Sequence, residues 1–135
     1  MPLCTEQMGT PLLRQLSERF GVVVWWATRV EARSAFAREL RAGALTTMQH
    51  QQVVGRLEEL QQGWREIQPT EDLRRLAESM LERYHLRAAD ALQLAAAYTW
   101  CKSRPFNRHF ISGDRRLLDA ARETGFRIVD TAGAH

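Results

Sequence analysis

The stretch LRAADALQLAAAYTWCKSRPFNRHFISGDRRLLDAARETGFRIVD, residues 86–130, decides the fold. It predicts a helix over 87–102, a short apolar strand over 109–112, a helix over 114–124 closed by Gly125, and a last strand over 126–129. Strands that alternate with helices in this way indicate an α/β layered fold with a mainly parallel sheet.

The chain before this stretch continues the same alternation. The run VVVWW at 22–26 predicts a strand that is buried on both faces, as parallel sheets require. Further helices are predicted over 11–20, 29–42, 46–62 and 71–84, and a short strand over 64–68. Because no linker or repeat interrupts the 135 residues, we expect a single domain over 1–135.

Composition limits the function classes. The formal charge of +3, from 19 basic and 16 acidic residues, is compatible with an anionic partner such as RNA but does not argue for one alone. Cys4 and Cys101 form neither a CxxC pair nor a Cys/His cluster, so we expect free thiols in a reducing compartment. With no leader pattern and no apolar run of about 20 residues, we predict a cytoplasmic protein without a membrane partner.

Three acids stand where a parallel sheet would gather them. Asp114 directly follows the strand HFIS, Glu31 follows VVVWWATRV, and Asp90 lies in an alanine- and leucine-rich helix. A carboxylate among apolar neighbours is costly unless a partner, a metal or water compensates its charge. The pattern suggests carboxylates that hold a divalent cation at one end of the sheet.

Each acid also has a structural alternative. Asp114 could be the N-cap of the helix that follows it, and the two roles are compatible. Asp90 could be a first-turn acid that the helix dipole favours. Glu31 could pair with Arg29 or Arg33 on a solvated face.

Secondary site residues have alternatives of the same kind. Ser112 could cap or lie near the metal, and Thr28 could hydrogen-bond locally or join the site. Arg87 could contact phosphate or form an exposed ion pair. Trp25 and Trp26 could stack on bases, although a core role is expected for at least one of them.

Three motifs together resemble the PIN domain superfamily, and within it the VapC-type ribonuclease toxins. They are Thr28-Arg29-Val30-Glu31, the run LRAADALQLA at 86–95, and the run ISGDRRL at 111–117. The acids lie 59 and 24 residues apart, in the order and spacing that make the combination specific.

The resemblance implies a three-layer α/β/α fold and a Mg²⁺- or Mn²⁺-dependent endoribonuclease. Glu31, Asp90 and Asp114 would be its catalytic and metal-binding acids, with Thr28, Ser112 and Arg87 as secondary residues. RNA would be the substrate, a small antitoxin protein the partner, and a homodimer is a further expectation. Arg104 and His109 have the RxxxxH spacing of the all-helical HEPN ribonucleases, but Pro105 breaks the helix that this motif needs.

One departure from the family pattern matters. The family's first strand, which carries an aspartate and lies in the middle of the sheet, has no counterpart here, since residues 1–10 contain one acid, Glu6, in a polar context. We expect a late recorded start. Strand 22–26 would then pair directly with strand 109–112, or residues 1–8 or a partner chain would fill the gap. The alternative function is a catalytically depleted module that binds a protein or RNA.

The helix predicted over 46–62 carries an apolar stripe of Val53, Val54, Leu57 and Leu60. The stripe is either ordinary core or, as the resemblance implies, partly exposed for a dimer or antitoxin contact.

Overall fold

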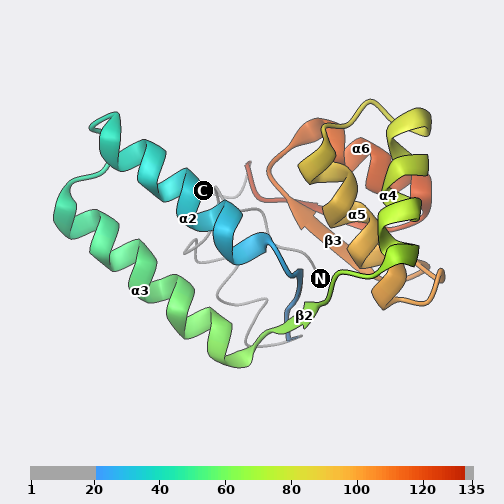
Figure 1. Cartoon of the computed structure of the whole chain (residues 1–135), viewed down its shortest axis with the longest axis horizontal. Coiled ribbons are helices and arrows are strands. Elements are labelled where there is room, and N and C mark those ends of the chain that lie inside the picture. Colours follow the sequence, from blue (N-terminus) through green and yellow to red (C-terminus); the bar gives the residue numbers. More distant parts are fainter. Residues whose placement is uncertain (1–20, 133–135) are drawn as a thin grey trace.

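The computed structural model of the chain describes residues 21–132 and confirms a mixed α/β architecture with short parallel strands (Figure 1). The elements are β1 (Val23–Trp25), α2 (Thr28–Arg41), α3 (Thr47–Gly63), β2 (Arg65–Ile67), α4 (Glu71–Arg83), α5 (Ala88–Trp100), β3 (His109–Ser112), α6 (Arg115–Thr124) and β4 (Arg127–Asp130). Each predicted element within this range is present, with ends shifted by at most two residues. The helix predicted over 11–20 lies outside the described residues.

Local capping chemistry explains where several helices begin and end. Thr46 and Gln49 form a capping box at the start of α3, with bonds of 3.1 and 2.9 Å. The Thr70 hydroxyl accepts from the Leu73 N–H at the start of α4. Gly125 ends α6 with a φ of 117°, which confirms its predicted role as a C-cap glycine.

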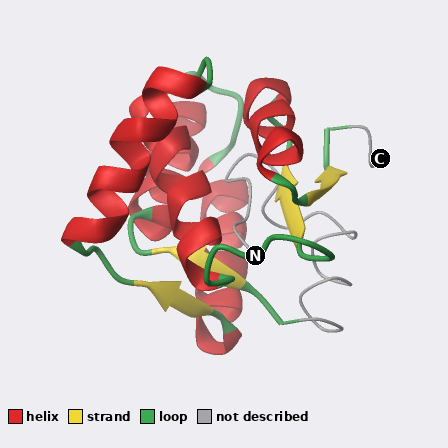
Figure 2. Ribbon diagram, turned by 90° about the vertical axis from the view of Figure 1, so that its right-hand side faces the viewer, coloured by secondary structure: helices red, strands yellow, loops and turns green. Residues whose placement is uncertain are grey.

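Within residues 21–132 the four strands form two two-stranded parallel sheets, with no ladder between them (Figure 2). In one, Val23 pairs with Arg65, and in the other His109 pairs with Arg127. The predicted direct pairing of strand 22–26 with strand 109–112 is therefore wrong for the described part of the chain. No ladder joins β1 to β3 within residues 21–132, and residues of both pairs, among them Val23 and His109, line a small apolar pocket together with Ala97 of α5.

The other two ways of closing this gap stay predictions, because residues 1–8 lie outside the described residues and a partner chain is a separate molecule. β1 and β3 are the more buried strands of their pairs, whereas β2 and β4 are partly exposed.

Two apolar clusters form the core and share the same strands. Trp25 and Phe110 belong to a cluster with α4, α5 and α6, whereas Val24 and Ile111 belong to a cluster with α2 and α3. Neighbouring residues of one strand thus contact different groups of helices, which Figure 1 shows on either side of the strands. This explains why the runs VVVWW and HFIS are apolar at successive positions.

The stripe on α3 belongs largely to this second cluster. Leu57 is fully buried, while Val53, Val54 and Leu60 are partly buried against it. The core interpretation is confirmed for Leu57, and the homodimer stays a prediction. No helix among residues 21–132 is long and apolar enough to cross a bilayer.

Candidate functional site

Glu31 and Gln93 join the start of α2 to α5 across 62 residues of sequence. Glu31 lies in the first turn of α2, just beyond the carboxyl end of β1, and is half-buried. Its Oε2 accepts a hydrogen bond of 2.8 Å from Nε2 of Gln93, whose side chain is buried. The predicted alternative, an ion pair of Glu31 with Arg29 or Arg33, is not formed among the described residues.

Asp90 lies close enough to Glu31 to act on its charge. Burial raises the pKa of the Glu31 carboxyl, the Gln93 hydrogen bond lowers it, and the negative charge of Asp90 raises it further, so that the net pKa is above the ordinary 4.5. Asp90 is also an acid in the first turn of α5, as its structural alternative predicted. The structure therefore brings two of the three predicted acids together.

Asp114 has the capping role that its alternative predicted. Its Oδ1 accepts from the Leu117 N–H at 3.1 Å and so caps α6, and its side chain is exposed. Its own N–H donates to the Ser112 hydroxyl at 3.0 Å, and Ser112 is buried. Both residues thus stabilise the turn after β3, and a metal role of either stays a prediction.

Thr28 and Arg87 depart from their structural alternatives. The Thr28 hydroxyl is fully buried and has no hydrogen-bond partner among residues 21–132, so the expected local bond is not formed. Arg87 is exposed at the N-cap position of α5 and forms no salt bridge within the same part of the chain. An orphaned buried hydroxyl is costly, which marks Thr28 as a residue to test.

The two tryptophans divide between core and surface. Trp25 is 4% exposed and belongs to the core, whereas Trp26 is 49% exposed, with the rings 6.4 Å apart in an edge-to-face arrangement. The core role expected for at least one of them is confirmed for Trp25.

Gln93 is the residue that sequence reasoning missed. It stands one helical turn after Asp90 in the run ALQLAAA, where it alone interrupts a buried apolar segment. A polar side chain at a core position needs a hydrogen-bond partner, so this interruption is a feature that could have singled it out.

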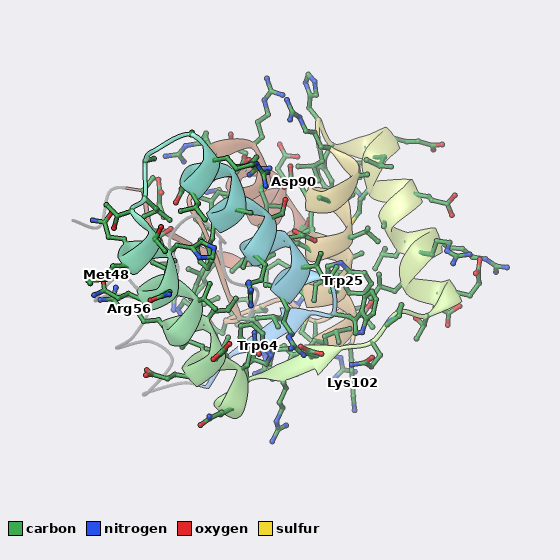
Figure 3. All side chains as sticks on the ribbon, turned by 60° about the vertical axis from the view of Figure 1, so that its left-hand side comes forward. Trp25, Met48, Arg56, Trp64, Asp90 and Lys102 are labelled. Atoms are coloured by element: carbon green, nitrogen blue, oxygen red, sulfur yellow. The ribbon has the colours of Figure 1, made fainter. Side chains whose placement is uncertain are left out.

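Glu31, held by Gln93, and the nearby Asp90 supply two carboxylates, and Figure 3 labels Asp90. No group of three or more His, Cys, Asp or Glu side chains suited to a metal occurs within residues 21–132. The donor set fits a Mg²⁺ ion that is bound through one or two carboxylates and keeps several waters. Asp114 as a third ligand stays a prediction.

No protein-family model matches this chain, and no curated protein matches it either.

Proposed function

We propose that the chain is a PIN-type domain with a three-layer α/β/α fold and that it hydrolyses RNA phosphodiester bonds with the help of Mg²⁺ or Mn²⁺. The observation that supports this is the half-buried Glu31 carboxylate beside Asp90. Two adjacent carboxylates repel each other, and a divalent cation between them would remove that repulsion.

Glu31 and Asp90 would hold the metal. Bound there, the metal would orient the scissile phosphate, offset the negative charge of the transition state and lower the pKa of an attacking water. Gln93 would keep the Glu31 carboxylate turned toward Asp90 through its bond to Oε2, which leaves Oε1 for other contacts. Asp114 remains a proposed third ligand, because its cap bond uses Oδ1 and leaves Oδ2.

The proposal includes the partners that the resemblance implies: an RNA substrate, a small antitoxin protein and a second copy of the chain. The experiment is Mn²⁺-dependent cleavage of a fluorophore-labelled RNA by the full chain and by Asp90→Asn. Asp72→Asn is the matched control, because Asp72 is also a first-turn acid, on the neighbouring helix α4. Cleavage that survives Asp90→Asn contradicts the proposal.

A second candidate is the catalytically depleted module that binds a protein or RNA. It is favoured by the absence, within residues 21–132, of a three-residue group suited to a metal. Isothermal titration with Mn²⁺ separates the two candidates, since the depleted module should bind the ion no better than Asp90→Asn does.

A further inference from the structure

A pocket of about 610 Å³ opens at the amino ends of three strands. Its lining includes Val23 at the start of β1, Arg65 at the start of β2 and His109 at the start of β3. Figure 3 labels Asp90 in the upper part of the view and Lys102 in the lower part, and the rise of α5 from Asp90 to Trp100 is roughly 15 Å. The pocket is of a size typical of ligand sites and is remote from the carboxylate pair.

The surroundings of this pocket are basic. Arg65 and Arg108 line it, and no acidic residue is among its described lining residues. Neither arginine forms a salt bridge with a residue of the described part of the chain. Lys102 and Arg104 extend the positive charge along the loop between α5 and β3, and Arg127 begins β4 beside His109. Such a field attracts anions.

Two aromatic rings accompany these charges. The guanidinium carbon of Arg108 lies 5.1 Å from the centroid of the Trp100 ring, so stacking holds this arginine at the pocket wall. Phe106, on the same loop, is 82% exposed, the most exposed of the large apolar side chains among residues 21–132. An exposed aromatic ring beside arginines is the combination on which single-stranded nucleic acids bind, since bases stack and phosphates pair with cations.

The loop that carries these residues has a fixed and strained backbone. Lys102, Ser103 and Asn107 have φ values of 53°, 63° and 61°, in the left-handed region that costs energy for residues other than glycine. Turn hydrogen bonds from the Arg104 N–H to Cys101 and from the Arg108 N–H to Pro105 hold it. A helix C-terminus favours nearby cations, which accounts for some of the charge, but it accounts for neither the strain nor the exposed phenylalanine.

We infer that the pocket at the amino ends of the strands, with the Lys102–Arg108 loop, binds single-stranded RNA at a second site. Arg65 and Arg108 pair with its phosphates, and Phe106 stacks on a base. The choice of RNA as the ligand rests on the proposed function, whereas the anion site rests on the pocket alone.

The test is fluorescence anisotropy of a labelled 12-nucleotide oligouridylate with the full chain in EDTA, so that no metal contributes. Arg65→Gln/Arg108→Gln should weaken binding at least tenfold and make the dependence of log affinity on log salt shallower by about 1.4, for two lost phosphate contacts. Phe106→Ala should weaken binding at least about fivefold. The control is Arg41→Gln/Arg56→Gln, two exposed arginines on α2 and α3 whose loss should leave affinity and slope unchanged.

Because Arg108 packs on Trp100, the variant Lys102→Gln/Arg104→Gln tests the site without touching that stack, and it should also weaken binding. Wild-type affinity in both double variants overturns the inference. Displacement of the RNA by uridine monophosphate or by polyglutamate at an equal concentration of negative charge also overturns it. If Asp90→Asn keeps full cleavage while the arginine variants lose RNA, the proposed function fails and the second site stands. If Asp90→Asn loses cleavage while the arginine variants bind RNA like the wild type, the second site fails and the proposed function stands.

Discussion

The two ends of the parallel strands differ in charge and in how their charged side chains are held. At the carboxyl ends, Glu31 bonds to Gln93, Asp114 caps α6, and Asp130 accepts from Arg115 at 3.2 Å. At the amino ends, cations such as Arg65 and Arg108 form no salt bridge with any residue from 21 to 132.

Helix dipoles explain part of this polarity. α2 begins just after β1 and α6 just after β3, at carboxyl ends where a helix favours acids, whereas α3, α5 and α6 end before β2, β3 and β4, at amino ends where a helix favours cations. What the dipoles leave unexplained is the half-buried Glu31 beside Asp90 at one end and the exposed Phe106 beside an open pocket at the other. These two features, which helix dipoles do not explain, are the reason for proposing a metal at one end and RNA at the other.

The largest effect should come from Asp90→Asn at the carboxyl ends. If the proposed function holds, losing one of two carboxylate ligands should lower Mn²⁺-dependent cleavage about 100-fold or more, since a metal supplies several kcal/mol of transition-state stabilisation. RNA binding in EDTA should stay within about twofold of wild type, as the amino-end site is separate. A parallel loss of cleavage and EDTA binding would show that the two ends are one site.

A second prediction concerns the anchor of the amino-end loop. A Cβ at Gly125 would lie 3.0 Å from Cγ of Pro105, and φ is 117°. Gly125→Ala should therefore lower the free energy of unfolding by at least about 1 kcal/mol and weaken RNA binding by moving the loop. Gly55→Ala, inside α3 with open space around it, should instead be neutral or stabilise by about 0.5–1 kcal/mol. Chemical denaturation measures the free energy of unfolding of both variants. Equal changes in the two would show that the Pro105 contact does not stabilise the fold.

Asp114 allows its cap and its metal role to be separated. Asp114→Ala should cost about 1 kcal/mol of unfolding free energy, because the Leu117 N–H loses its acceptor. Asp114→Asn should keep most of that stability, since asparagine caps as well as aspartate. If Asp114→Asn nevertheless loses cleavage, the acid acts on the metal; if it cleaves like wild type, Asp114 is a cap and the carboxyl-end site has two acids.

How far the sequence could predict this molecule depended on the range of the interactions involved. The C-cap glycine Gly125 and the apolar runs VVVWW and HFIS set the elements locally, and these predictions are confirmed. The lack of pairing between β1 and β3 is a tertiary feature, since residues of both strands and of α5 line the same small pocket, and no local pattern encodes it. The same holds for the bond between Glu31 and Gln93, because its partners lie 62 residues apart.

The smallest predicted effect is a dependence of stability on pH at the carboxyl ends alone. Burial, and next the charge of Asp90, raise the pKa of Glu31 in the folded chain above its ordinary 4.5, against the Gln93 bond. Ionised Glu31 therefore destabilises the fold: this penalty is absent below about pH 4.5 and complete above the folded pKa. Glu31→Gln should raise the melting temperature at pH 7.5 but not at pH 4.

Asp90→Asn should lower the pKa of Glu31 in an NMR titration, because a like charge is removed. Arg65→Gln at the amino ends should shift the melting temperature equally at both pH values. Glu82→Gln, at an exposed position on α4, serves as a carboxyl control. Millimolar Mg²⁺ should stabilise the wild type and not Glu31→Gln, because only the ionised carboxylate binds the ion. An equal shift in the melting temperature of Glu31→Gln at pH 4 and pH 7.5, with no response to Mg²⁺, would mean that Glu31 behaves as an ordinary surface acid. The carboxyl ends of the strands would then differ from the amino ends only in the sign of their charge.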